Sequence, residues 1–393
     1  MSGTSSKPPP GSVAVRKSGM GRLERLPISS KPLDHLYERV KTIDDGSGNL
    51  GGMNAGVYIV REKKTRQIYV QKCYRSNNSA LIKLFRDEIG YMRRLMHSSI
   101  VQYVDAYVNV KAPYEAAAYM EYCDRGSLRD MVQIYNAEKN KNQNMFIPES
   151  FIWHALLGLS DALYFLNTGQ SFISVELQKN DPQKWKPIIH RDIKPDRPLL
   201  IPEADIFLRS RDTPNSPKPP YVLLSDFGIA CYEDATTAGS NKAGPYLCAG
   251  TPEYHAPELC FNPKPTPLQS QTQQRSPHTA LSDIFAIALL MYCMCERSLF
   301  PHIDPKCLPL RSAEALGRAA RPARLDISAR GVYSDYLARV IDWAGAREPS
   351  NRPDAQMLVE GVQRQCQLWK ADPNWQAQVG ETLPGWAAPK RKV

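Results

Sequence analysis

Runs of alternating apolar and polar residues predict strands in the first third of the chain. Two β-rich runs, residues 55–60 and 67–74, are joined by the polar stretch 61–66, which is typical of a hairpin. Residues 79–96 then place apolar side chains at helical spacing and predict an amphipathic helix. Two more strands are expected, over 100–110 and 115–122. Three or more strands around one helix make a small α+β lobe.

The pattern changes to helical periodicity after Gly126. Helices are expected at residues 127–137, 151–167, 283–295, 334–345 and 354–367. Long polar interruptions fall at 171–187, 210–220 and 262–277. The last two are rich in Pro, Ser and Gln and lack periodicity, so we expect surface loops there. The chain is thus predicted to be α+β, with a small β-rich lobe followed by a larger, mostly helical lobe.

Length, charge and cysteine content narrow the class of protein. The 393 residues exceed one typical core, which agrees with two lobes. The net charge is +10, but the basic residues are spread along the chain, so no nucleic-acid partner is expected. The nine cysteines contain no C-x-x-C pair and are expected to be reduced intracellular thiols. The most apolar run, 284–295, is too short to span a bilayer, so no membrane partner is expected.

The two ends of the chain differ in composition from its middle. Residues 1–32 are rich in Ser, Pro, Gly and basic residues, and we expect a disordered basic arm; a transit peptide is the alternative. Residues 368–393 are expected to be a C-terminal tail that ends in the basic stretch 389–393. This stretch resembles a nuclear-import signal, so the expected location is intracellular, either cytoplasmic or nuclear or both.

Three short motifs occur in order along the second half of the chain. Residues 190–195 read H-R-D-I-K-P, residues 226–228 read D-F-G, and residues 256–258 read A-P-E. Three ordered motifs at this spacing are far more specific than any one of them alone. Over residues 33–367 the chain resembles the eukaryotic protein kinases.

This resemblance implies a bilobal protein-kinase fold, with a small lobe over residues 33–122 and a large lobe over 123–367. It also implies an enzyme of the serine/threonine type, which transfers the γ-phosphate of ATP to protein hydroxyl groups with the help of Mg²⁺ or Mn²⁺. Residues 226–230 (D-F-G-I-A) and 206–208 (I-F-L) are in addition similar to the NIMA-related group.

The same resemblance assigns roles in catalysis. Asp192 would accept the hydrogen bond, and finally the proton, of the substrate hydroxyl. Lys194 would place a positive charge beside the transferring phosphate, and a lysine at this place is typical of the serine/threonine branch. Asp226 would hold Mg²⁺ against the phosphates. Lys72 would grip the phosphates while Glu88, from the helix that follows, holds it in place.

Nucleotide binding is expected between the two lobes. The hinge is expected at residues 120–123, where backbone groups of Glu121 and Cys123 would hold the adenine edge and Met120 would guard the pocket behind it. The resemblance also places Val57 and Val70 at the nucleotide.

The glycine-rich loop matches the family pattern poorly. Counted back from the lysine that grips the phosphates, the three glycine positions hold Leu50, Gly52 and Ala55. An alternative G-x-G-x-x-G lies at residues 46–51. The glycines here, including Gly48, Gly51 and Gly52, would let backbone N–H groups approach a phosphate closely.

Two residues concern the protein substrate and its control. Thr251 would line the substrate groove and form a hydrogen bond near Asp192 and Lys194. Arg191 would bind a phosphate group in the activation segment, because Arg pairs with phosphate in a bidentate manner. The candidate acceptors of that phosphate are Thr236, Thr237, Ser240 and Tyr246. Leu247 stands where many kinases carry the phosphorylated threonine.

Three further residues have structural roles by resemblance. Glu258 would pair with Arg352 inside the large lobe, and such a buried pair specifies the architecture more than it adds stability. Asp283, at the start of an apolar helix, would anchor the backbone of the loop that contains His190. It could also, or instead, cap its own helix.

The metal site departs from the family pattern. Asn is expected five residues after Asp192, but Arg197 stands there, and its side chain has no acceptor for a metal ion. Either the next strand is 197–201 and one ligand is lost, or the strand is 205–208, after an insertion, and Asp205 supplies a carboxylate. We favour the insertion, since Pro198 suits a strand poorly; a translated intron is a third explanation. The function is predicted to be an active kinase or, alternatively, a pseudokinase that binds nucleotide or partners.

Overall fold

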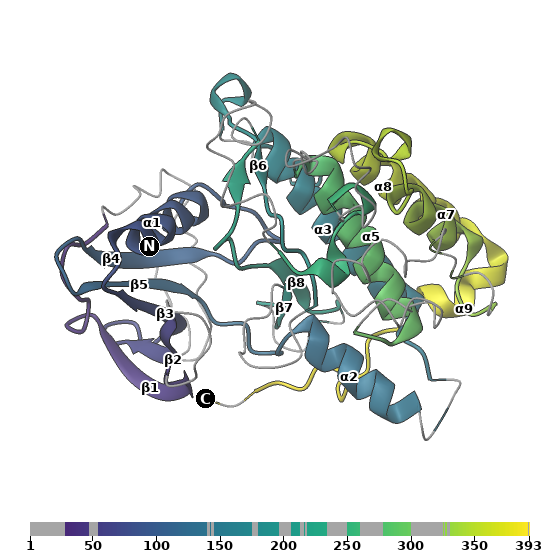
Figure 1. Cartoon of the computed structure of the whole chain (residues 1–393). Coiled ribbons are helices and arrows are strands. Elements are labelled where there is room, and N and C mark those ends of the chain that lie inside the picture. The colour runs from purple at the N-terminus through teal and green to yellow at the C-terminus, as the bar shows by residue number, and fades with distance from the viewer. Residues whose placement is uncertain are drawn as a thin grey trace, which may run out of the picture.

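A five-stranded antiparallel sheet forms the small lobe, at the left of Figure 1, in the order β1-β2-β3-β5-β4. Its strands are β1 Tyr37–Asp44, β2 Asn54–Glu62, β3 Ile68–Ser76, β4 Tyr103–Asn109 and β5 Tyr114–Glu121. The predicted hairpin is confirmed as β2 and β3. Strand β1 was not predicted, because Tyr37 is its one fully buried residue and its sequence therefore shows no apolar alternation.

The computed structural model describes residues 28–46, 54–139, 142, 145–174, 180–195, 206–212, 216, 218–233, 250–259, 278–299, 325, 327, 331–391 and 393. The chain pairs with the sheet slightly before residue 33, the predicted start of the small lobe. The backbone N–H of Ser29 donates to the carbonyl of Ala106, and its carbonyl accepts from the N–H of Val108 at the edge strand β4.

Helix α1, Ser79–Met92, packs against this sheet. The side chain of Asn78 caps its first turn by accepting from the N–H of Ala80. Its buried residues recur at helical spacing and are Ile82, Phe85, Glu88, Ile89 and Met92. The helix ends at Met92 rather than at residue 96. Leu95 is still buried after the turn at Arg93, which extends the apolar pattern beyond the helix.

In the described part of the large lobe, the five longer helices each lie within four residues of their predicted bounds. They are α2 Leu128–Lys139, α3 Glu149–Thr168, α5 Ala280–Glu296, α7 Asp335–Ala344 and α8 Ala355–Ala371. Helix α3 packs on both α5 and α8, and α5 is buried from Ser282 onward (Figure 1). Over the described residues, no helix has both the length and the apolar character needed to cross a membrane.

Short elements complete the large lobe. Two small antiparallel ladders pair β6 Ile188–Ile189 with β9 Cys231–Tyr232, and β7 Ile206–Arg209 with β8 Tyr221–Leu224. The 3₁₀ turns are η2 Pro182–Lys184, η4 Pro252–Tyr254, η5 Pro257–Leu259, η8 Pro349–Asn351 and η9 Pro373–Trp375, and one turn of α-helix follows as α9 Gln376–Val379.

The position of β7 agrees with one of the two readings of the metal loop. The strand that pairs with β8 begins at Ile206, with Ile206 opposite Leu224 and Leu208 opposite Val222. Ile206 and Leu208 are buried, and no proline interrupts the ladder. This is the strand that the insertion reading requires.

A buried ion pair fixes the turn η5 to the loop before α8. Arg352 donates from Nη1 and Nη2 to the two carboxylate oxygens of Glu258, at 2.8 and 2.7 Å. The Arg352 side chain is fully buried and also donates to three carbonyl groups, those of Leu281, Ala346 and Arg347. The guanidinium thus ties three separate segments together.

We expect Arg352→Ala to lower the free energy of unfolding by about 3 kcal/mol, because it leaves the Glu258 carboxylate and several carbonyls without their partner. The matched control is Arg347→Ala, an exposed arginine five residues earlier, which should change stability by less than about 0.5 kcal/mol. Urea denaturation followed by fluorescence measures both. Equal losses in the two variants would contradict the structural role of the Glu258 pair.

Candidate active site

A cleft of about 1020 Å³, its open mouth included, lies between the two lobes. The residues expected at the nucleotide that line it are Val57, Val70, Lys72, Met120, Glu121, Cys123 and Asp226. Val57 and Val70 come from the small-lobe strands β2 and β3, whereas Phe207 comes from β7 of the large lobe. Apolar side chains from both lobes with a few polar groups between them make a site of the kind that binds small ligands.

Several lining residues were not predicted, among them Ile43, Phe207, Asp130 and Arg391. Ile43 lies in the strand that the pattern missed. Phe207 was expected in a strand, but the prediction of a strand does not show which of its side chains face a ligand. Asp130 and Arg391 are 261 positions apart, so no local pattern connects them.

Lys72 joins the two lobes through its ammonium group. Its Nζ lies 3.5 Å from Oε1 of Glu88 on α1 and 3.2 Å from Oδ1 of Asp226 in the large lobe. The other Glu88 oxygen, Oε2, accepts from the hydroxyl of Tyr74 at 3.0 Å. The Lys72 and Glu88 side chains are 13% and 5% exposed, so water screens their attraction only weakly. Helix α1 is therefore held in the position in which the predicted Lys72–Glu88 pair forms.

Asp226 is aimed at Lys72 by an unusual backbone conformation. Its φ is 59°, in the left-handed region that a non-glycine residue rarely adopts. The next residue, Phe227, is buried and packs edge-on against His190 with ring centroids 4.9 Å apart. Burial raises the pKa of Asp226, but the ammonium groups of Lys72 and Lys194 outweigh it and lower the pKa to about 2. The carboxylate is therefore ionised at neutral pH.

The carboxylate of Asp283 holds the backbone of the loop before Asp192. Oδ2 and Oδ1 of Asp283 accept from the backbone N–H groups of His190 and Arg191, at 2.6 and 2.9 Å. Burial raises the pKa of Asp283 to about 7, and the two N–H donors act against that rise. The structure thus places Asp283 beneath the loop, where it orients the backbone that leads into Asp192, whereas Thr279 and not Asp283 caps α5. Arg191 has a φ of 73°, a second left-handed residue at this site.

Asp192 and Thr251 meet at a second, smaller cleft beside Arg191 and Tyr254. Oδ2 of Asp192 accepts from Nζ of Lys194. Oδ1 is buried and has no hydrogen-bond partner among the described residues, and the same holds for Oγ1 of Thr251. The hydrogen bond expected from Thr251 toward Asp192 and Lys194 is thus not present in the described structure. Both oxygens are therefore left without a partner in this cleft, which is uncommon for buried polar atoms.

Comparison with known proteins agrees with this geometry. Residues 46–362 match the family model described as protein kinase domain. The chain belongs to the protein kinase family. Its kinase domain holds Lys72, Glu88, Asp192 and Asp226 in the arrangement described above.

Several NIMA-type kinases are similar to this kinase chain, which confirms the resemblance to that group. The G2-specific protein kinase nimA of Emericella nidulans is 28% identical over 283 residues, which cover 69% of this chain and 33% of nimA. The serine/threonine-protein kinase Nek2 of Homo sapiens is 24% identical over 326 residues, which cover 82% of this chain and 58% of Nek2. The probable kinase nek2 of Dictyostelium discoideum is 23% identical over 319 residues, with 79% and 60% covered. The chain spans less than two thirds of the length of each of these relatives.

Some predicted site residues lie outside the described residues. They are Gly48, Gly51 and Gly52 of the glycine-rich loop, Arg197, Pro198 and Asp205 of the metal loop, and the candidate phosphate acceptors at 236–246. Arg191, the residue expected to bind such a phosphate, donates from Nε to the carbonyl of Ile229 at 2.6 Å. This contact holds the guanidinium against the start of the activation segment.

Among the described residues, the carboxylate of Asp226 is suited to bind a divalent cation. Mg²⁺ and Mn²⁺ prefer ionised carboxylate oxygens, and Asp226 stays ionised because two lysines lower its pKa. The residue predicted to be the second ligand, Asp205, immediately precedes β7. Of the two predicted metal ligands, Asp226 and Asp205, only Asp226 belongs to the described residues.

We expect Tyr74→Phe to weaken ADP binding about threefold to tenfold. The variant keeps the ring that packs on Phe85, with centroids 3.6 Å apart, but removes the hydroxyl that orients Glu88, a bond to a charged group. Lys72 would then be held less firmly for the phosphates. Titration calorimetry with ADP and Mg²⁺ measures the change.

The matched control is Tyr69→Phe, on the same strand, whose hydroxyl donates to Gln67 at 2.6 Å. Its affinity for ADP should equal that of the unchanged protein. An unaltered affinity in Tyr74→Phe would show that Tyr74 does not position Glu88.

Proposed function

We propose that this chain is an ATP-dependent serine/threonine protein kinase, which transfers the γ-phosphate of ATP to hydroxyl groups of proteins. The observation that carries the proposal is the convergence of Lys72, Asp226 and the Asp192–Lys194 pair. Lys72 contacts Asp226 at 3.2 Å, and Lys194, bonded to Asp192, is near enough to lower the pKa of Asp226. Phosphoryl transfer needs this combination of positioning and fixed charge.

Each residue would have a defined part in the transfer. Lys72 would bind the phosphates of ATP, and Glu88 would keep its ammonium group in place. Oδ1 of Asp192, buried and without a hydrogen-bond partner in the described chain, would accept the hydrogen bond of the substrate hydroxyl and then its proton. Lys194 would hold the other Asp192 oxygen and place positive charge beside the moving phosphate. A bound Mg²⁺ or Mn²⁺ supplies charge that neutralises the phosphates, and Asp226 would hold it.

The proposed partners are ATP and proteins with serine or threonine at the phosphorylated position. Lys194, two residues after Asp192, supports this substrate class through its resemblance to the serine/threonine branch. We also propose a cytoplasmic or nuclear location, which the basic residues 390–392 support.

The proposal is tested by transfer of labelled phosphate from ATP to a generic serine- and threonine-containing protein such as casein, with Mg²⁺ or Mn²⁺. We expect Asp192→Asn to lower the rate by about 10²- to 10⁴-fold, because the amide cannot accept the proton. Asp335→Asn, an exposed aspartate on α7, is the matched control and should leave the rate unchanged. Absence of transfer by the intact protein with both metal ions would refute the proposal.

A pseudokinase is the second candidate, and Arg197 is the observation that favours it. Its guanidinium stands five residues after Asp192 and cannot ligate a metal ion. In that case ADP and ATP should still raise the melting temperature, whereas transfer should be absent. Replacement of residues 197–205 by a single Asn should then restore transfer if this segment alone prevents it.

A further inference from the structure

The segment that follows α9 runs back along the large lobe toward the hinge. The hydroxyl of Ser150 donates to the carbonyl of Glu381 at 2.5 Å, and the ring of Trp386 packs near Tyr135, with centroids 5.1 Å apart. Ala387 and Ala388 are buried in the core. Figure 1 shows this yellow segment running past α2 to the C-terminus beside the small lobe. We call residues 381–391 the strap.

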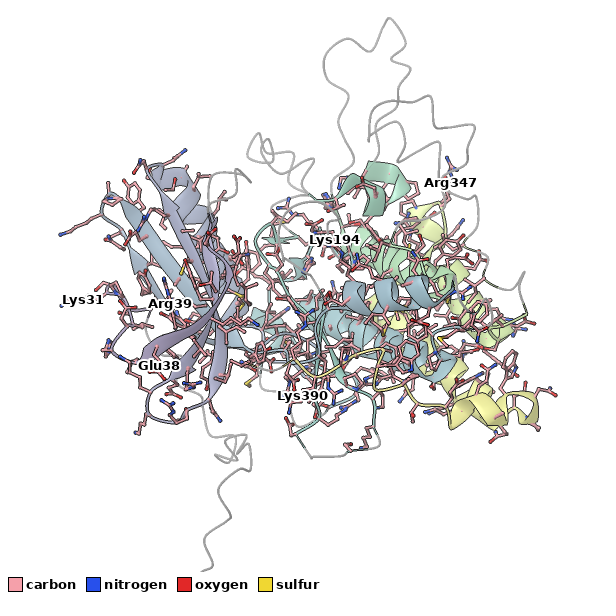
Figure 2. The ribbon with its side chains drawn as sticks, turned by 90° about the horizontal axis from the view of Figure 1, so that it is seen from below. Lys31, Glu38, Arg39, Lys194, Arg347 and Lys390 are labelled. Carbon is pink, nitrogen blue, oxygen red and sulfur yellow. The ribbon has the colours of Figure 1, made fainter. Side chains whose placement is uncertain are left out.

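The strap is hydrogen-bonded to the backbone just after the hinge. Arg125 donates from Nη1 to the carbonyl of Ala388 at 2.9 Å, and the N–H of Arg391 donates to the carbonyl of Asp124 at 2.7 Å. Lys390 lies 3.7 Å from a carboxylate oxygen of Asp124, and Figure 2 shows it on the large-lobe side of the boundary between the lobes. The strap is therefore attached at several points rather than by one side chain.

The guanidinium of Arg391 is fixed at the wall of the nucleotide cleft. Its Nη2 donates to Oδ2 of Asp130 at 2.6 Å, and both residues line the cleft. The same Asp130 oxygen accepts from the N–H and the hydroxyl of Ser127, each at 2.7 Å. A Cβ atom on Gly126 would lie 2.9 Å from Nη2 of Arg391, and Gly126 has a φ of 77°. A glycine at this place thus leaves room for the arginine.

Arg391 lies at the hinge side of the cleft, whereas Lys72 and Asp226 mark the phosphate side. A nucleotide with its base between Val70 and Phe207 and its phosphates at Lys72 would present its sugar in between, toward the cleft mouth. The 2′ and 3′ hydroxyls of a ribose both donate and accept hydrogen bonds. Arg391 can only donate and Asp130, when ionised, can only accept, so the pair is complementary to such a diol.

We propose that Arg391 is a nucleotide-binding residue, supplied by the strap, which together with Asp130 recognises the ribose hydroxyl groups. The inference rests on the proposed function, because it needs a nucleotide in the cleft. The strap then does more than cover the large lobe: it contributes a donor to the ligand site from the far end of the sequence.

The test compares ADP with 2′,3′-dideoxy-ADP by titration calorimetry in the presence of Mg²⁺, on the full chain. We expect Arg391→Ala to weaken ADP binding about tenfold, the effect of one charge-assisted hydrogen bond. The affinity for the dideoxy nucleotide, which has no hydroxyl to bond, should be the same in the variant and in the unchanged protein. Lys390→Ala is the matched control, since Lys390 is on the strap, does not line the cleft and is 68% exposed.

The outcomes separate this inference from the proposed function. ADP binding that Arg391→Ala leaves unchanged would overturn the inference alone, and so would an equal loss for ADP and its dideoxy analogue. Failure of the unchanged protein to bind ADP would overturn both proposals. The melting temperature of Arg391→Ala without nucleotide should equal that of Lys390→Ala, because both variants alter partly exposed side chains of the strap.

Discussion

The site depends on one shared ammonium group, that of Lys72, between carboxylates from two lobes. Glu88 comes from α1, and Asp226 comes from the segment after β8. Three charged groups are largely removed from water here, and the cost of that burial is offset when each group meets an opposite charge. If α1 moved away, Glu88 would lose Lys72, and if the two lobes separated, Asp226 would lose it. The relative position of the lobes is therefore coupled to the charge balance at the phosphate site.

Backbone strain is concentrated at the same place. Arg191 and Asp226 both have left-handed backbone conformations, each of which costs about 1 kcal/mol or more for a residue with a side chain. Asp283 holds one of these segments through two backbone N–H groups, and Phe227 anchors the other by burial against His190. The surrounding contacts thus keep two unfavourable conformations, one beside Asp192 at the smaller cleft and one at Asp226 in the nucleotide cleft.

Local patterns predicted the elements well, because each depends on neighbours in sequence. The β2–β3 hairpin, α1 and the large-lobe helices have clear periodicity. The motifs contain Asp192 and Asp226, and the family resemblance that they carry adds Lys72 to the set. The sequence pattern did not predict strand β1, because only Tyr37 within it is fully buried. The sequence did not predict that Arg391 lies at the cleft, because its partners Asp124 and Asp130 are far from it in sequence and only the tertiary fold brings them together. The sequence predicted a C-terminal tail with a basic end that resembles a nuclear-import signal, whereas in the structure Arg391 of this end contacts Asp130.

The attachment of the strap has a practical consequence for work with this kinase domain. Because residue 391 is bonded beside the hinge, anything fused after Val393 would emerge at the entrance of the nucleotide cleft. A bulky affinity tag there would crowd the entrance and distort affinity measurements. A small environment-sensitive dye at the same end would, by contrast, sit where it can report each arrival and departure of a ligand.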